Sequence, residues 1–202
     1  LYSPATMQNT NRPPIDRSYA ELDIVTNYSF LRGASHAAEI VERAVQLGYG
    51  AIAVADVNTL AGIVRAHVAA KLAELKLIVG VRLTLVDGPD LLVWVPDRLA
   101  YATLCRLLTL GKRRTEKGEC LLTLGDVIEQ ASGLLVGVIP PADLIHEDVS
   151  EPLRRLRDAF GPSLSIAGCC DFTIDPARRI GHLIDLSHRT GVPIVATNHV
   201  HY

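Results

Sequence analysis

The sequence has few aromatic residues, no excess of charge of either sign and no long apolar run, and each shortage excludes a class of protein. Aromatic side chains make up 5% of the 202 residues. Lys and Arg number 20 against 22 Asp and Glu, so a net charge of −2 provides no overall attraction to nucleic acids. No apolar run approaches the ~18 residues that a membrane span requires. We therefore expect a soluble, cytoplasmic protein with no membrane partner.

Cysteine is also scarce, and its spacing excludes two kinds of site. The four cysteines include no C-x-x-C pair and no ladder of spacings typical of zinc fingers or secreted disulfide scaffolds: Cys105, Cys120, Cys169 and Cys170. Reduced thiols in a cytoplasm are the expected state.

The composition that remains is that of one globular domain. Hydrophobic residues make up 49% of the chain, enough for a core in a domain of this length. Residues 1–18 contain three prolines among polar residues and no apolar period, so we expect a flexible amino-terminal arm. The domain is expected to span residues 19–202.

Short β-rich runs alternate with segments of helical period along that domain. Most of the runs are continuously apolar, as in parallel strands that are covered on both faces. The seven strand candidates are 21–26, 51–56, 76–85, 91–96, 133–139, 163–168 and 192–197.

Four of the connecting segments carry helix start signals. Ser35, Thr59 and Asp97 can each cap a following helix, and Pro176 can occupy the first position of a fourth. Seven strands linked mostly by helices predict an α/β fold with a closed or nearly closed barrel of mostly parallel strands; an open doubly wound sheet is the alternative.

One polar segment, GKRRTEKGEC at 111–120, interrupts the domain. Its four basic residues can contact phosphate groups, for example on DNA: Lys112, Arg113, Arg114 and Lys117. The competing interpretation is a solvated surface loop, which is the usual place of a charge run.

Chemistry in a (β/α) barrel is placed just after the strands, so the strand ends hold the candidate site residues. These are Asp23 in the first strand, Asp56 at the end of the second, Arg82 in the third, the group Cys169, Cys170 and Asp171, and His199 with His201 after the last. If the strand conformation continues, both imidazoles of the H-x-H sequence point to one face, which is a moderate signal for a metal site.

Several blocks in register carry a family resemblance: YAELDIVTNYSFLRGASHAAEIVERAVQLGYGAIAVADVNTLAGIVRAHVAAK, KLIVGVRL, LCRLLTLGKRR and VPIVATNHVHY. Residues 19–202 resemble the amino-terminal PHP (polymerase and histidinol phosphatase) domain of bacterial DNA polymerase III α subunits. The stretches NYSFLRGASH, VNTLAGIVRAHVAAK and RLLTLGKRR are similar, more narrowly, to the error-prone α-type polymerases of damage-induced translesion synthesis. The resemblance implies a distorted seven-stranded (β/α) barrel, which agrees with the strand count.

The metal-binding members of this family place histidines and acids at the strand ends, holding up to three divalent ions for phosphoester hydrolysis. By resemblance, the usual H-x-H falls here on Asp23 and Val25, the usual Asp-His on Asp56 and Val57, and the bridging Glu on Arg82. Only His199 and His201 keep the character of ligands.

Those replacements disfavour a multinuclear site. Valine cannot ligate a metal, and the permanently protonated Arg82 adds positive charge where cations would bind. We therefore predict a degenerate cluster of Asp23, Asp56, Arg82, His199 and His201, in which Arg82 pairs with Asp23 or Asp56. No cofactor is then expected; the alternative is a single Zn²⁺ or Mn²⁺ held by Asp23, His199 and His201.

The resemblance implies that the domain is an amino-terminal, catalytically inactive scaffold within a larger DNA-directed DNA polymerase for translesion synthesis and repair. A Mg²⁺-dependent polymerase site would lie beyond residue 202. Partners would be the rest of the polymerase chain, DNA through the whole protein, and accessory translesion proteins. The alternatives are an autonomous metal-dependent phosphoesterase or 3′–5′ proofreading exonuclease, and a binding module that keeps one ion for stability.

Overall fold

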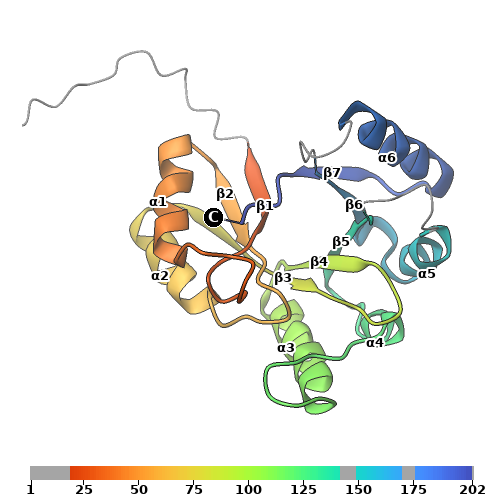
Figure 1. Ribbon diagram of the computed structural model, residues 1–202, viewed down its shortest axis with the longest axis horizontal. Helices are drawn as coiled ribbons and strands as arrows, with labels where there is room; N and C mark the ends of the chain where they lie inside the picture. Colours follow the sequence, from red (N-terminus) through yellow and green to blue (C-terminus); the bar gives the residue numbers. More distant parts are fainter. Residues whose placement is uncertain (1–18, 142–148, 170–175, 202) are drawn as a thin grey trace, which may run out of the picture.

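Seven strands form a single sheet in which every strand lies beside its neighbours in the sequence. The computed structural model describes residues 19–141, 149–169 and 176–201 (Figure 1), so the predicted arm at 1–18 lies outside the described residues. The strands are β1 (Ala20–Ile24), β2 (Ala51–Val54), β3 (Lys76–Leu83), β4 (Asp90–Val95), β5 (Leu135–Ile139), β6 (Leu164–Cys169) and β7 (Ile194–Thr197).

Strand β4 alone runs against the others. It pairs antiparallel with β3 and β5, whereas the other four neighbouring pairs are parallel. Only residues 84–89 connect β3 to β4, too few for the crossover that a parallel connection requires. The prediction of mostly parallel strands is confirmed.

The two ends of the sheet approach each other, which closes the barrel almost completely. The segment after β7 lies beside β1: the Val25 amide donates to the Val200 carbonyl over 2.9 Å, and the Val200 amide donates to the Asp23 carbonyl over 2.8 Å. The predicted distorted barrel is therefore correct, and the open doubly wound sheet is not adopted.

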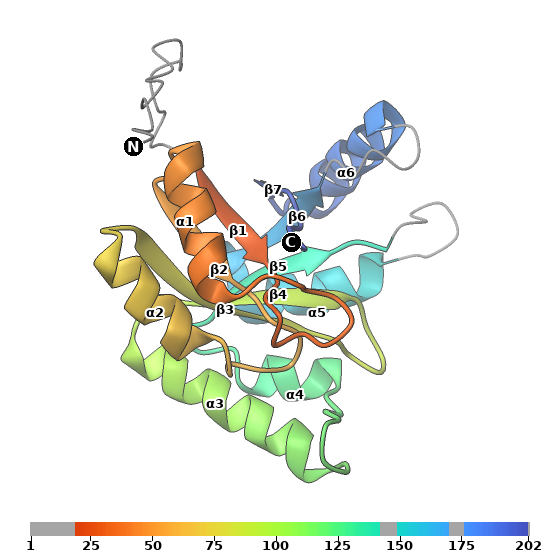
Figure 2. The same ribbon diagram turned by 60° about the vertical axis from the view of Figure 1, so that its left-hand side comes forward.

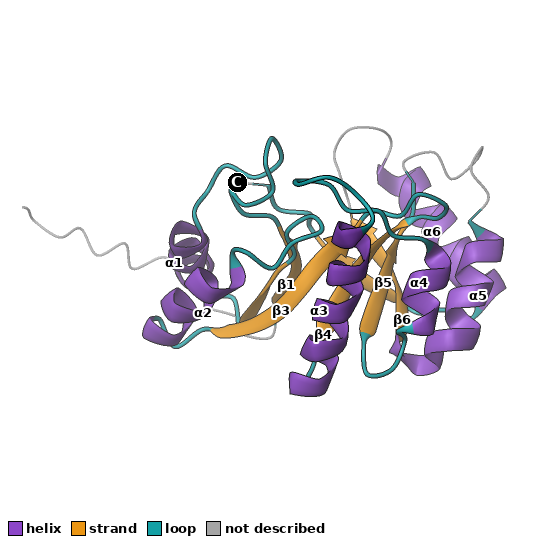
Figure 3. Ribbon diagram, turned by 90° about the horizontal axis from the view of Figure 1, so that it is seen from below, coloured by secondary structure: helices purple, strands orange, loops and turns teal. Residues whose placement is uncertain are grey.

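Six helices cover the outside of the barrel in the described part of the chain (Figures 2 and 3). They are α1 (Ala37–Leu47), α2 (Ile63–Leu72), α3 (Arg98–Arg113), α4 (Leu124–Glu129), α5 (Ser150–Phe160) and α6 (Pro176–Thr190), with a 3₁₀ turn at Gly161–Ser163. Helices α1 and α2 lie side by side over β1–β3. Among the described residues, none of these helices combines the length and the apolarity that crossing a membrane requires.

The predicted helix starts are only partly correct. Asp97 caps α3, since its side chain accepts from the Ala100 amide over 2.9 Å. Helix α1 instead has His36 as its cap residue, and the His36 amide donates to the Glu39 carboxylate. Helix α2 begins at Ile63, four residues after the predicted cap, with Gly62 as its cap residue.

The later start of α2 follows from a close approach of the backbone to Asp56. A Cβ atom at Gly62 would lie 2.7 Å from Asp56 Oδ2 and 3.0 Å from Thr26 Oγ1. Only glycine fits so near these atoms, so the chain must pass them before the helix can begin.

Helices α4 and α5 were not predicted, because α4 is only six residues long and charged residues are numerous in α5. In α5, three buried side chains, Leu153, Leu156 and Phe160, face the sheet while the arginines between them are exposed. In α4, Thr123 and Asp126 form a capping box. Tertiary packing and end caps therefore contribute more to the formation of these helices than the number of their apolar residues does.

One large ring, that of Trp94, packs among small and aliphatic residues in the barrel interior. Trp94 is 7% exposed, and its indole nitrogen donates to the Leu22 carbonyl over 2.9 Å, joining β4 to β1 across the interior. Ala53, Ala55 and Ala167 pack around this ring. The interior is thus a packed core, and the candidate site residues lie at the mouth of the barrel.

Candidate functional site

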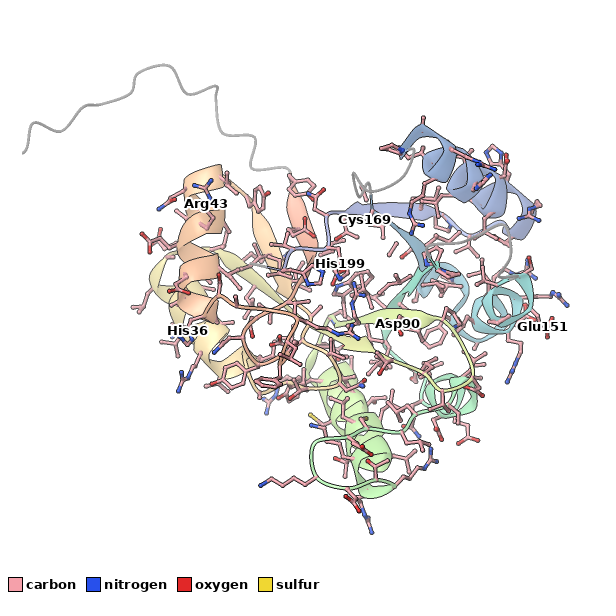
Figure 4. All side chains as sticks on the ribbon, viewed as in Figure 1. His36, Arg43, Asp90, Glu151, Cys169 and His199 are labelled. Carbon is pink, nitrogen blue, oxygen red and sulfur yellow. The ribbon has the colours of Figure 1, made fainter. Side chains whose placement is uncertain are left out.

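The carboxyl ends of the parallel strands meet at one mouth of the barrel, where the predicted site residues gather. Asp23 lies in β1, Asp56 after β2, Arg82 in β3, and His199 with His201 after β7. In Figure 4, His199 and Asp90 lie near the centre of the molecule, whereas His36 and Arg43 lie on the outer helix α1. The structure thus brings the five predicted residues to one region of the fold.

The centre of the mouth is an ion pair between Arg82 and Asp23. Arg82 Nη2 donates to Asp23 Oδ2 over 2.5 Å, and the two side chains are 5% and 2% exposed. Asp90 Oδ2 lies 3.9 Å from Arg82 Nη1. Burial raises the pKa of Asp23, and the charge of Arg82 works against that rise. The predicted pairing of Arg82 with an acid is confirmed for Asp23.

Asp56 has a different role. Its carboxylate accepts from the Thr26 amide (2.8 Å), the Thr26 hydroxyl (2.8 Å) and the Ser29 hydroxyl (2.7 Å). Asp56 is 1% exposed, so these bonds replace the water that burial removes. The predicted alternative, an Asp56–Arg82 pair, is therefore not formed; Asp56 instead shapes the loop that follows β1.

The two histidine rings lie against each other at the edge of the mouth, tilted by 55°. Their ring centroids are 4.0 Å apart, and Val200 between them packs against the core cluster that contains Ile24. His199 has a positive φ of 52°, a conformation that non-glycine residues seldom adopt. Burial, together with the charge of Arg82, lowers the pKa of His199 to about 3, so this imidazole is neutral at pH 7.

These residues do not fit the multinuclear metal centre that the family resemblance implies. Three buried atoms of this cluster have no hydrogen-bond partner among the described residues: Asp23 Oδ1, Arg82 Nε and His199 Nε2. Asp23 Oδ1 and His199 Nε2 can accept a hydrogen bond or ligate a metal ion. Arg82 Nε, however, belongs to a cation that is paired directly with the candidate ligand Asp23. In the described ranges, no group of three or more His, Cys, Asp and Glu side chains is placed to hold a metal ion. Cys170 and Asp171 lie outside the described residues.

Sequence reasoning missed Glu21, which joins β1 to the end of β7. The residue is fully buried, and its Oε1 accepts from the Thr197 hydroxyl (2.5 Å) and from the amides of Leu22, Asp23 and Asn198. The available signal was a charged residue inside an otherwise apolar strand, two positions before Asp23. Glu21 thereby helps to hold the barrel closed below the mouth.

The polar segment 111–120 is partly helical. Lys112 and Arg113 form the last turn of α3, and all four predicted basic residues are exposed. Arg114 is held by Asp126 through two hydrogen bonds of 2.5 and 2.8 Å, which satisfies its guanidinium within the protein. Lys112 and Lys117 line a pocket of about 620 Å³, together with Tyr28, Phe30 and Arg32 of the loop after β1.

Solved structures share the fold at low sequence identity. A protein from Bifidobacterium adolescentis, assigned as a metal-dependent phosphoesterase, superposes with a TM-score of 0.66 at 16% identity over 91% of this chain and 87% of its own. An amidohydrolase from Chromobacterium violaceum, solved with bound sulfate and no metal, gives 0.61 at 13% identity over 90% and 87%. At these identities the likeness supports the barrel architecture.

Curated relatives are closer in sequence. The error-prone DNA polymerase 2 of Agrobacterium fabrum is 45% identical over 183 residues, which is 91% of this chain and 17% of that protein. The error-prone DNA polymerase of Caulobacter vibrioides is 42% identical over 192 residues, 95% of this chain and 17% of the relative. The chain therefore spans about one sixth of the length of these relatives.

The match to a protein family covers most of the described fold. The PHP domain family matches residues 21–164, from β1 to the start of β6. The barrel, the placement of the strand ends around one mouth and this match agree, and the chain belongs to the PHP domain family.

Proposed function

We propose that the chain is the PHP domain of an error-prone DNA polymerase and that it acts there as a scaffold without hydrolytic activity of its own. The supporting observation is the buried ion pair between Arg82 and Asp23 at the mouth. The relatives named error-prone DNA polymerases support the larger context.

The ion pair makes a multinuclear hydrolytic centre unfavourable on electrostatic grounds. Such a centre needs anionic ligands that offset several cationic charges and lower the pKa of bound water. Here the carboxylate of Asp23 is already neutralised by a guanidinium that remains protonated at any working pH. A divalent ion at Asp23 would have to displace Arg82 or lie beside its charge.

Two measurements test the proposal. Primer extension across a lesion by the full-length polymerase chain tests the polymerase context, in which Mg²⁺ would serve a polymerase site outside these residues. Release of nucleotides from a 3′-labelled oligonucleotide by the 202-residue chain, in excess Mn²⁺ or Zn²⁺, tests the scaffold role. We expect extension by the full chain and no release by the domain; chelator-sensitive release would refute the inactive scaffold.

The second candidate is a metal-dependent phosphoesterase or 3′–5′ exonuclease with one retained ion. It is favoured by the free Asp23 Oδ1 and His199 Nε2 atoms and by the nearby His201 ring. It predicts stoichiometric Zn²⁺ or Mn²⁺ by elemental analysis, and it predicts that His199→Gln removes the ion. If the ion is present without turnover, and a chelator only lowers the melting temperature, the ion has a structural role alone.

The basic residues next to the 620 Å³ pocket are proposed to contact DNA phosphates in the whole protein. Lys112, Arg113 and Lys117 carry this proposal, while Arg114 is already paired with Asp126. Lys112→Gln with Lys117→Gln in the full chain should weaken DNA binding similarly for all sequences and reduce its salt dependence. Unchanged binding at low and high salt would reject the contact. Accessory translesion proteins and a cytoplasmic location belong to the same proposed context.

A further inference from the structure

Helix α2 carries a row of exposed apolar side chains in addition to its buried ones. Its sequence is IVRAHVAAKL, and Ile63, Ala66 and Ala70 are buried against the barrel. On the outer face, Val64, Val68 and Leu72 follow one another at intervals of four residues and are 71%, 54% and 83% exposed. The exposed side chains of Arg65, His67 and Lys71 lie between and beside them.

Helix α5 shows what a solvent-facing helix of this protein looks like. Its inner face is apolar, and its exposed positions carry Arg154, Arg155, Arg157 and Asp158. On α2 the charged Arg65 and Lys71 are exposed too, but they flank an apolar row of Val64, Val68 and Leu72 that has no counterpart on α5. The difference indicates that α2 is adapted to contact with protein, since contiguous exposed apolar surface usually marks an interaction site.

A groove beside the apolar row extends this surface onto α1. It has a volume of about 420 Å³ and is lined mainly by small and apolar side chains, with Leu72 and Ala69 on one wall and Val41 and Val45 on the other. Helices α1 and α2, which line this groove, lie side by side in Figure 2. Its form suits an apolar helix or extended segment laid between the two helices.

We propose that the outer face of α2 and the α1–α2 groove dock the remaining part of the polymerase chain. This proposal rests on the proposed function, and it adds the surface through which the domain is joined to the rest. The relatives continue far beyond the part that this chain spans, which is 17% of their length. A covalently attached segment has an effective concentration in the millimolar range, so it covers the face in preference to a second copy.

Hydroxyl-radical footprinting of side chains tests the docking face directly. Leu72 and Val68 are compared between the 202-residue chain and the full-length polymerase chain. Leu99 and Val86 are matched controls on other surfaces, at 81% and 64% exposed. We expect several-fold less modification of Leu72 and Val68 in the full chain and unchanged modification of the controls. Equal modification in both forms, or equal protection of Leu99, would overturn the proposal.

Paired variants provide a second, energetic readout. Val68→Gln with Leu72→Gln should leave the melting temperature of the 202-residue chain unchanged and lower that of the full chain, whereas Val86→Gln with Leu99→Gln should affect neither. If modification of Leu72 in the 202-residue chain falls as the protein concentration rises, a second copy covers the face and the proposal fails. Primer extension separates the two proposals: extension with an unprotected α2 rejects only the docking face, and protection without extension rejects only the polymerase function.

Discussion

Replacing Arg82 by methionine should destabilise the protein by several kcal/mol at neutral pH. The substitution keeps most of the aliphatic stem but leaves the Asp23 carboxylate, whose side chain is 2% exposed, without its partner. Removing one member of a buried ion pair costs about 3–5 kcal/mol. For a chain of this length, that corresponds to a fall in melting temperature of roughly 6–20 °C.

The destabilisation by Arg82→Met should depend on pH in a defined direction. Burial raises the pKa of Asp23 above its unfolded value, and loss of Arg82 raises it further. The folded state then binds more protons than the unfolded state, so stability falls as pH rises from about 4 through the folded pKa. The deficit relative to the unmodified protein should be smallest near pH 4 and largest at pH 7.

Denaturant unfolding at pH 4, 5.5 and 7 measures both effects, and two variants serve as controls. Arg154→Met breaks an exposed pair with Glu151, at 58% and 62% exposure, and should change stability by less than about 0.5 kcal/mol. Asp23→Leu combined with Arg82→Met replaces both charges and should recover most of the loss. A folded Arg82→Met variant that loses under about 1 kcal/mol at pH 7 would refute the view that this pair holds the mouth together.

Three further predictions concern other residues. Gly137→Ala should lower the free energy of unfolding by about 1–3 kcal/mol because its Cβ would lie 2.7 Å from Trp94 Cη2. Gly181→Ala in α6, where a Cβ would meet no atom within 4 Å, should be neutral or stabilising by about 0.5–1 kcal/mol. Thermal unfolding compares the two variants. Asp126→Asn should cost about 1–3 kcal/mol at pH 7. The hydrogen bonds from Arg114 hold the pKa of Asp126 well below its usual range, so its contribution is full above about pH 4 and is lost as pH falls further; denaturant curves that show an equal deficit at pH 7 and pH 2.5 would contradict this. The His199 imidazole, with a pKa of about 3, should remain neutral at pH 5 by nitrogen-detected NMR, and its contribution to stability should be lost as pH falls from about 6.5 toward 3.

The strands and the barrel could be predicted because continuous apolar runs and cap residues are local signals. All seven strand candidates overlap observed strands, and Asp97 caps α3 as expected. The start of α2 could not be predicted, since it depends on how closely Gly62 approaches Asp56, a residue after a neighbouring strand. Helix α5 escaped prediction because its three buried side chains are outnumbered by charged residues.

The candidate site, too, could be predicted only in part from the sequence. The sequence by itself determined that Val25 and Val57 cannot ligate a metal and that Arg82 brings a permanent charge to the mouth, since these are properties of the side chains alone. Tertiary structure decided that Arg82 pairs with Asp23, that Asp56 binds Thr26 and Ser29 instead, and that Glu21 connects β1 to the end of β7. Side-chain chemistry limits which partners are allowed. The choice among them depends on distances of a few ångströms between strand ends far apart in sequence, and only the closed barrel sets those distances.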